Sequence, residues 1–338
     1  MDWTKSYSST WRVFRVNRDT WADAEAVQNV IEVGVTKTAN GALIESGSMQ
    51  ITGTLDPDYY RIVLTAEQGG EIQRVDVATL LYQQHDGNYN HGVDTTDLEG
   101  YSVLYPASTK AVTVGEYAPS GVNGAEYAAD LLADAINAPV EVEGSFTLNE
   151  HVVHELGTTV LDAAWSVLTA GNFVIQIDGS GVVHIRPMPT EPALIINNES
   201  VGMLMNEIGY TADISEIPNR YVVIDGVNIT IAENNDPESA VSYPSRGFHV
   251  DLVDTSPALV NGETYAGYAE RMLKSASILK EEKDYNREYA PDVYPYSLIK
   301  ASVDGLEGNF RIESQSLACK NGIVVTEKAA KETLMYEG

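Results

Sequence analysis

The segment HVVHE, with His151, His154 and Glu155, comes closest to a metal-binding motif in this 338-residue chain. A zinc-peptidase helix has the order His-Glu-x-x-His, which points both imidazoles at one ion and leaves the glutamate to act as a base. Here the histidines are three residues apart, the glutamate follows both of them, and no third ligand stands out. We therefore predict no metal site, and we interpret both histidines as ordinary surface or core side chains.

The next candidate is Cys319, the only cysteine, which lies in the segment SLACKNG. A nucleophilic thiol needs a base such as histidine beside it, and none is near in the sequence. We interpret Cys319 as a small core residue at the end of a strand. A single cysteine also excludes an intramolecular disulfide, which fits folding in the cytoplasm of the cell that makes the protein.

Other catalytic and ligand-binding motifs are missing or explained by turns. Ser180 lies in Asp-Gly-Ser-Gly rather than in a nucleophile elbow, and Asp178 and Asp225 each precede a glycine in an expected turn. Phosphate-loop and dinucleotide-binding glycine patterns are absent, and the acidic loops at 94–99 and 234–238 lack EF-hand spacing. Among the 49 carboxylates, the sequence neither supports nor excludes a pair that could act as a glycosidase site. We predict no catalytic, cofactor-binding or metal-binding residues, no cofactor, and no enzymatic activity.

Four tyrosines interspersed with two prolines could form a ligand platform or a packed connection: Tyr285, Tyr289, Tyr294 and Tyr296, with Pro291 and Pro295. Tyrosine offers a rigid apolar ring and a polar tip, which suits either role. We favour packing, against a neighbouring part of the chain or against another subunit.

The segment at 157–187 positions the elements around it. Apolar residues recur at helical spacing from Val160 to Leu168, Thr158 or Thr159 can cap this helix, and Gly171 can end it in a left-handed conformation. Two alternating stretches then flank the turn at 178–181, which predicts a β-hairpin. We expect a compact packing unit with no catalytic role.

The remaining sequence predicts strands on both sides of this unit. Short strand patterns fill residues 1–111, with an exposed loop at 85–100. Strand patterns resume after Leu194, interrupted by a polar loop at 232–246. Two helices are expected, one from Tyr117 to Ala138 and one from Tyr265 to Asp284.

We therefore predict an α+β, mainly β fold with three domains. Residues 1–115 form a first β domain, a barrel or a sandwich, and residues 116–190 a small α/β domain of helix plus hairpin. Residues 191–338 form a second β domain with a long helix near 265–284.

The charge is unusual. Twenty-one Lys and Arg against 49 Asp and Glu give a formal net charge of −28, which opposes any grip on nucleic acid through its phosphates. Two interpretations of this charge stay open. It could serve solubility alone, or it could form an acidic protein wall that DNA slides past without binding. No leader opens the chain, and no apolar run approaches the roughly 18 residues needed to span a bilayer. We expect a soluble product.

Several stretches together resemble the tail hub proteins of phages and prophages, the hub shared by contractile tails, long non-contractile tails and type VI secretion spikes. They are LIESGSMQI at 43–51, the whole segment 157–187, IPNRYVV at 217–223, YAERMLKSASILKEEKDYNREYAPDVYPYSLI at 268–299 and GNFRIESQSLAC at 308–319. The ordered series carries the resemblance, which spans nearly the whole chain.

The resemblance implies a structural protein without catalytic residues. It implies a homotrimeric ring in which two β-barrel-like domains per subunit adapt a sixfold tail tube to a threefold tip around a DNA channel. The implied partners are a tail tube or distal tail protein on one side and a tip, spike or fibre protein on the other, in the virion. Some relatives carry a lytic domain after the hub. This chain ends at Gly338, soon after the last expected strand, so we do not expect one here.

Two other classes of function stay open. A receptor- or glycan-binding tip protein would use aromatic side chains in polar loops, where only Tyr89 and Tyr243 occur. A cell-wall hydrolase would need a catalytic pair or a metal that the sequence does not reveal.

Overall fold

The computed structural model describes residues 1–39, 43–90, 93–113, 115–149, 151–226, 228–255 and 264–337; at 84, 85, 88–90, 93, 94 and 206 it describes the backbone alone. The chain divides into two compact units. The first joins Met1–Ile208 with Asp284–Ala329, and the second joins Gly209–Lys283 with Ala330–Gly338. The predicted boundaries near residues 115 and 190 stay a prediction.

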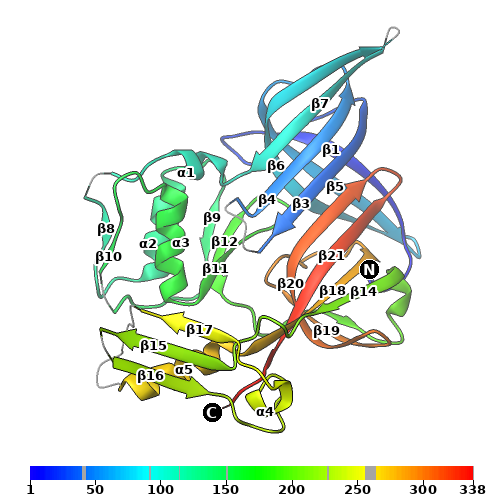
Figure 1. The fold of residues 1–338 in the computed structure, drawn as a ribbon. Helices are drawn as coiled ribbons and strands as arrows, with labels where there is room; N and C mark the ends of the chain where they lie inside the picture. Colours follow the sequence, from blue (N-terminus) through cyan, green and yellow to red (C-terminus); the bar gives the residue numbers. More distant parts are fainter. Residues whose placement is uncertain are drawn as a thin grey trace. The chain divides into compact units, whose positions relative to one another are not determined.

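The N-terminal part of the first unit is a series of antiparallel strands (Figure 1). They are β1 (Ser8–Val16), β2 (Asp23–Ala26), β3 (Val30–Thr38), β4 (Glu45–Thr52), β5 (Asp58–Gln68), β6 (Glu71–Asn90) and β7 (Val93–Ser102). Alternating residues on β3 and β4 bury one face, as the period of a half-buried strand requires, whereas β5 is buried on both faces from Asp58 to Leu64. The main fold class predicted from the sequence, mainly β with a few helices, is confirmed.

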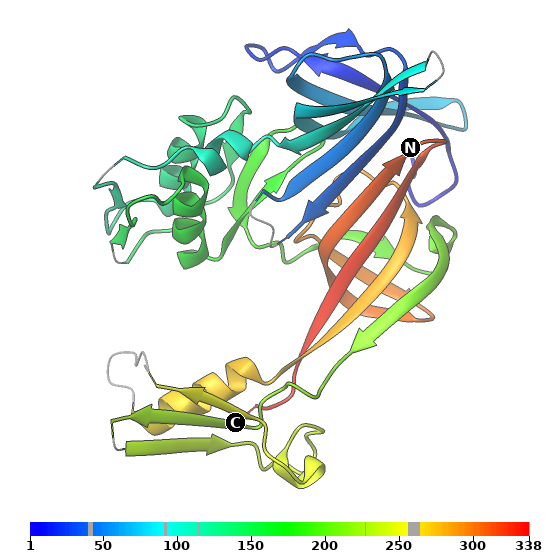
Figure 2. The same cartoon turned by 45° about the horizontal axis from the view of Figure 1, so that its top comes forward.

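A second set of strands comes from the C-terminal third. These strands are β13 (Pro192–Ile196), β14 (Leu204–Ala212), β18 (Ile278–Glu288), β19 (Leu298–Val303), β20 (Leu306–Cys319) and β21 (Ile323–Leu334), with the 3-10 turn η1 (Val201–Met203) before β14. Strand β20 pairs with β3 in antiparallel register, with Leu317 opposite Val35 and Cys319 opposite Val33. Both views show the two strands side by side (Figures 1 and 2). The β strands from the two ends of the chain therefore form one continuous sheet, in the order β14-β18-β21-β20-β3-β4-β7-β6-β5-β1-β2.

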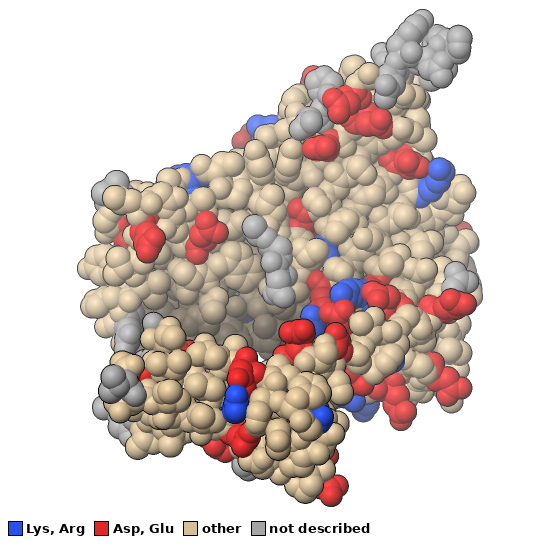
Figure 3. Space-filling model, viewed as in Figure 1, with Lys and Arg blue, Asp and Glu red and all other residues tan. Residues whose placement is uncertain are grey.

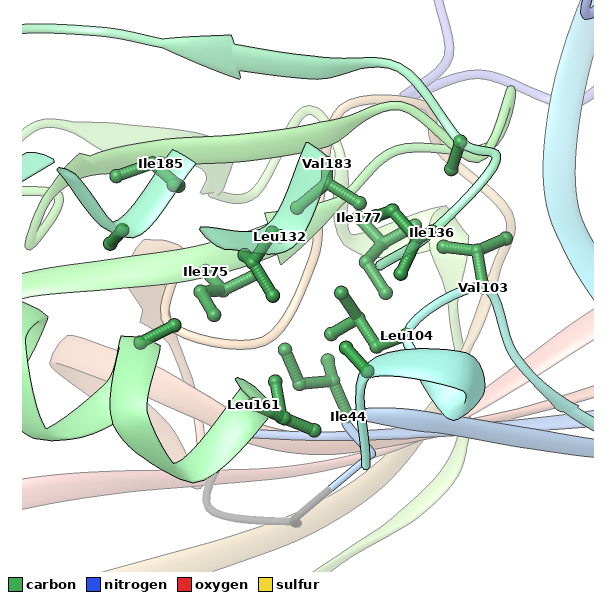
Figure 4. Close-up of a cluster of buried hydrophobic side chains, with 14 of the residues drawn as sticks. Ile44, Val103, Leu104, Leu132, Ile136, Leu161, Ile175, Ile177, Val183 and Ile185 are labelled. Carbon is green, nitrogen blue, oxygen red and sulfur yellow. The ribbon is translucent and has the colours of Figure 1, made fainter. Parts of the chain in front are cut away.

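The α/β segment contains the short helices of the first unit. Its elements are α1 (Tyr105–Thr109), β8 (Tyr117–Ala118), α2 (Gly124–Ala133), β9 (Val140–Val142), β10 (Val152–Val153), α3 (Val160–Ala170), β11 (Phe173–Ile177) and β12 (Val183–Pro187). Leu132 and Leu161 from the two longer helices pack on Ile175 and Ile185 of the hairpin (Figure 4). Ile44, which comes directly before β4, reaches the same core, so this segment does not bury its apolar face alone.

The predicted helix and hairpin at 157–187 are confirmed, with one correction. Thr159 caps α3 by accepting a hydrogen bond from the Asp162 amide. Gly171, however, has φ near −101°, and the left-handed residue is Asn172, with φ of 56°. Gly171 is needed for space instead, because a Cβ there would lie 2.4 Å from the ring of Phe146.

The predicted helix from Tyr265 to Asp284 is wrong in its second half. Helix α5 (Tyr265–Ala276) ends before Ser277, and β18 begins at Ile278. The Lys- and Glu-rich sequence carries helical periodicity, but the pairing of β18 with β14 on one side and with β21 on the other overrides that local preference. Tyr285 and Arg287 alternate into the interior as strand residues do.

The predicted loop at 85–100 is also wrong, because its described residues continue β6 and β7 as an antiparallel hairpin. The polar sequence does not indicate these strands, because they are stabilised by cross-strand pairing between β6 and β7. The first predicted helix is shorter than expected: Tyr117 lies in β8, and α2 covers Gly124–Ala133 with Asn123 as its cap.

The second unit contains a three-stranded sheet and a helix. Its elements are β15 (Arg220–Asp225), β16 (Asn228–Glu233), α4 (Tyr243–Arg246), β17 (Asp251–Asp254) and α5. Strand β15 is central, antiparallel to β16 and parallel to β17. Tyr221, Val223 and Ala232 form a small core with Tyr268 and Leu273 of α5, so the helix covers one face of the sheet.

Candidate functional site

The two histidines of HVVHE do not form a joint site. The His151 Nδ1 accepts a hydrogen bond from the Ser120 amide at 3.2 Å, and the His154 ring stacks on Tyr127 with centroids 6.4 Å apart. Burial lowers the pKa of His154, which favours the neutral ring in that stack. Glu155 is exposed. Within the described ranges, no group of three or more His, Cys, Asp and Glu side chains could hold a metal ion.

Cys319 is buried in the sheet core with 1% of its surface exposed, as the sequence predicts. Burial raises the pKa of its thiol to about 12. The thiolate, which is the reactive form, is therefore scarce at neutral pH.

Three of the four tyrosines are buried within the chain, which agrees with the packing favoured above, while Tyr294 is half-buried with Lys37 Nζ 5.2 Å from its ring centroid. Tyr285, Tyr289 and Tyr296 are 3%, 5% and 8% exposed, and burial raises the pKa of each. The Tyr296 hydroxyl donates to the Ala39 carbonyl, and Tyr289 packs its ring edge against Trp3. These three rings are therefore not available as a platform for a ligand.

The aromatic side chains named for glycan binding are likewise poor candidates. Tyr243 is 41% exposed, but one face of its ring stacks on His249 with centroids 4.3 Å apart. The side chain of Tyr89 lies outside the described residues.

The hairpin turn between β11 and β12 has the densest polar contacts of the α/β segment. Asp178 Oδ1 accepts hydrogen bonds from the Ser180 hydroxyl at 2.7 Å and the Val182 amide at 3.0 Å. Its other oxygen lies 3.1 Å from His184 Nε2. Asp178 is therefore a turn-stabilising residue, as the Asp-Gly pattern indicates. The sequence does not indicate His184, because nothing in its local context marks the strand position that faces Asp178.

We predict that His184→Gln removes a small part of the pH dependence of stability. The hydrogen bond to Asp178 raises the pKa of His184, although burial opposes it. A raised folded-state pKa gives stability that is full below the unfolded pKa and is lost as pH rises through the folded value. Between about pH 6 and 8, the unfolding free energy of the wild type should therefore fall relative to the variant. Urea denaturation across that range checks this, with His151→Gln as the control, and parallel curves for wild type and His184→Gln would contradict it.

The same turn inserts against the N-terminal strands. The Ser180 carbonyl accepts from Trp21 Nε1 and from Arg61, each at 2.8 Å, and the Gly179 carbonyl accepts from the Thr79 hydroxyl at 3.0 Å. Arg61 is 5% exposed and also binds Asp23 at 2.9 Å. These contacts hold the α/β segment on the sheet.

Two ion pairs lie deep in the first unit. Arg287 Nη2 is 2.6 Å from Glu327 Oε1, with side chains 1% and 0% exposed, and Lys37 Nζ is 2.6 Å from Glu45 Oε1, at 2% and 0%. The sequence does not reveal the first pair, because its members are forty residues apart on neighbouring strands. Removing one partner of such a pair is costly, because the other charge stays buried without compensation.

The surface carries the excess negative charge. On the face shown in Figure 3, acidic side chains are spread over most elements, and basic ones are fewer. Basic side chains are often paired with these carboxylates. Arg15 and Arg18, for example, both bind Asp58. In the described residues, no helix has the length and hydrophobicity that a membrane span requires.

Comparison with known proteins places this architecture in one class. No family model matches the sequence. No curated protein matches it either. Among solved structures, however, the fold is shared with tail proteins, and the similarity extends over nearly the whole chain.

Two such structures match end to end. The tail protein from Neisseria meningitidis MC58 has a TM-score of 0.65 and 13% identity, covering 97% of this chain and 98% of its own. The 43 kDa tail protein of prophage MuSo2 from Shewanella oneidensis has a TM-score of 0.62 and 12% identity, covering 95% and 98%. A chain of the Francisella PdpA-VgrG complex matches with a TM-score of 0.59 and 8% identity, over 99% of this chain and 60% of that one. The resemblance to phage and prophage tail proteins is thus confirmed as a shared fold.

Proposed function

We propose that this protein is a structural component of a phage or prophage tail, the hub of the baseplate or tail tip. The observation that carries the proposal is the shared fold with two tail proteins, one of them from a prophage, over at least 95% of this chain and 98% of theirs. The residues singled out for chemistry support a structural role too, because His154, Cys319 and the tyrosines all serve packing.

In this proposal three copies form a ring that adapts a sixfold tail tube to a threefold tip. A tube or distal tail protein binds one side, and a spike or fibre protein binds the other. DNA passes through the centre without specific binding. The formal charge of −28 supports this route, because carboxylates that line a channel repel phosphate and keep the wall from sticking. The ring's inner surface should therefore carry an excess of Asp and Glu.

Two measurements test the proposal. Light scattering across a concentration series should give the mass of three chains, and electron microscopy with labelled antibody should place the chain at the tip of tail particles. Absence of the chain from purified tail particles would refute a tail function. A ring with an electroneutral or basic lumen would refute the acidic channel alone.

Enzymatic activity is not part of this proposal, and its absence stays a prediction. Incubation of the purified chain with cell-wall material checks it. Hydrolysis that disappears in His151→Ala or His154→Ala would revive the hydrolase alternative.

A further inference from the structure

Strand β1 has an open edge in the first unit. It pairs with β5 along residues 8–15, but with β2 only at its C-terminal end. The last contact on the β2 side is the Val27 amide, which donates to the Val13 carbonyl at 2.8 Å. Asn29 follows with φ of 61°, a left-handed conformation that turns the chain toward β3. Within the described part of the chain, residues 8–12 of β1 therefore have no neighbouring strand on this side.

The register identifies the backbone groups that this edge leaves unpaired. In antiparallel strands, successive residues point their N–H and C=O groups alternately at one neighbour and at the other. Val13 points its carbonyl away from β5, so Ser9 and Trp11 point their groups the same way. Thr10 and Arg12 point theirs at β5. Among the described residues, no backbone group outside β1 bonds to the amide or the carbonyl of Ser9 or Trp11 on the open side.

Ser9 and Trp11 line a groove of about 530 Å³. Val30 and Ile31 at the start of β3 line it too, together with Lys320 in the turn between β20 and β21. The Trp11 indole connects the two sides, since its Nε1 donates to the Lys320 carbonyl at 3.2 Å. A row of unpaired N–H and C=O groups on a strand edge is a template for another strand. The groove therefore offers backbone hydrogen bonds to an extended chain, which would bind by adding a strand.

The charges of the groove indicate which extended chain fits. Arg12 and Lys320 line it, and none of the described residues in its lining is acidic. Lys320 binds Glu32 at 2.9 Å, whereas Arg12 is exposed and has no ion pair among the described residues. In a protein with 49 acidic and 21 basic side chains, this lining reverses the prevailing sign of charge. Complementary charge favours a segment that carries Asp or Glu.

We propose that an extended, acidic segment of a partner protein binds in this groove as an added strand beside residues 9–13 of β1. Backbone hydrogen bonds to Ser9 and Trp11 hold the segment, and its carboxylates lie near Arg12. A glycan does not match the regular spacing of backbone donors and acceptors along a strand, and a basic segment would be repelled by Arg12. This binding site goes beyond the proposed function and does not depend on it.

The test uses the full chain and, as the probe, a short acetylated peptide of alternating valine and glutamate. Amide hydrogen exchange resolved by NMR should slow at Ser9 and Trp11 when the peptide is added. It should stay unchanged at Thr10 and Arg12, whose amides already bond to β5. The same peptide N-methylated at its central residues keeps its charge but loses backbone donors. Its dissociation constant, measured by isothermal titration calorimetry, should be at least about tenfold higher, the factor that one hydrogen bond supplies.

Two variants separate backbone pairing from charge. Ser9→Pro removes an N–H that faces the groove, a change that an edge strand tolerates, and should raise the dissociation constant about tenfold. Arg12→Glu should raise it by about tenfold at low salt and by less at high salt, because salt screens the charges. Lys300→Glu is the matched control: Lys300 is exposed on β19 and does not line the groove, so its replacement should leave the affinity unchanged. Urea midpoints equal to that of the wild type confirm that the variants fold.

Each contrary result overturns a stated part of the proposal. Exchange that does not slow at Ser9 and Trp11, or equal affinity for the N-methylated peptide, excludes strand addition to β1. A peptide of alternating valine and lysine that binds as tightly as the glutamate peptide excludes an acidic partner. A wild-type assembly that dissociates on Ser9→Pro in sedimentation equilibrium has a second copy in the groove, which overturns the proposed occupant. Absence of the chain from tail particles overturns the proposed function instead and leaves the groove standing.

Discussion

Glu327→Gln is expected to lower the free energy of unfolding by about 3–5 kcal/mol, the cost of leaving a buried charge without its partner. Arg287 remains in place with 1% of its side chain exposed and no water to replace the carboxylate. Gln315 also loses its charged acceptor, since its Nε2 donates to Glu327 Oε1 at 2.5 Å. The amide of the variant has nearly the same volume as the carboxylate, so the loss of unfolding free energy does not include the cost of a cavity.

Equilibrium urea denaturation at fixed protein concentration measures this loss. The matched control is Glu32→Gln, which breaks the exposed pair of Glu32 and Lys320, with side chains 47% and 67% exposed. That change should cost no more than about 1 kcal/mol. The double variant Arg287→Met/Glu327→Leu should recover most of the loss, because it removes both charges together. A cost below about 1 kcal/mol for Glu327→Gln would show that the pair does not hold these strands.

Gly179→Ala is expected to cost about 3 kcal/mol, the upper part of the range for overpacking a well-packed site. A Cβ at this position would lie 1.8 Å from the Asp76 carbonyl oxygen and 2.3 Å from its carbon. These atoms belong to the backbone of β6, where Asp76 is paired with Val63 of β5, so they cannot move aside without disturbing the ladder. The hydrogen bond from Thr79 to the Gly179 carbonyl would be lost as the turn withdrew.

The same denaturation assay reports the loss, and hydrogen exchange shows where it arises. We expect faster exchange at the Trp21 indole, which donates to Ser180 in this turn. Gly202→Ala is the control: its Cβ would meet nothing within 4 Å, and the change should stay within about 0.5 kcal/mol. Equal costs for the two alanine variants would mean that the turn does not insert against β6.

Local sequence determined the elements whose stability is local. The apolar spacing from Val160 to Leu168, a threonine cap and a turn with two glycines were enough to predict α3 and its hairpin. Asp178 was correctly predicted as a turn residue, since its hydrogen bonds reach only as far as His184. The interpretation of Cys319 as a core residue also followed from its neighbours.

Only the tertiary structure decided the rest, because the energies that decide it come from residues far apart in the chain. The stretch after Ala276 has a helical pattern, yet it is a strand because β14 and β21 supply its hydrogen bonds. The pairing of β3 with β20 brings residues 30–38 beside residues 314–319, and no local pattern in either strand predicts which strand it pairs with. The buried pair of Arg287 and Glu327 arises in the same way. Each depends on which strands become neighbours, and burial and strand pairing over the whole chain set that choice.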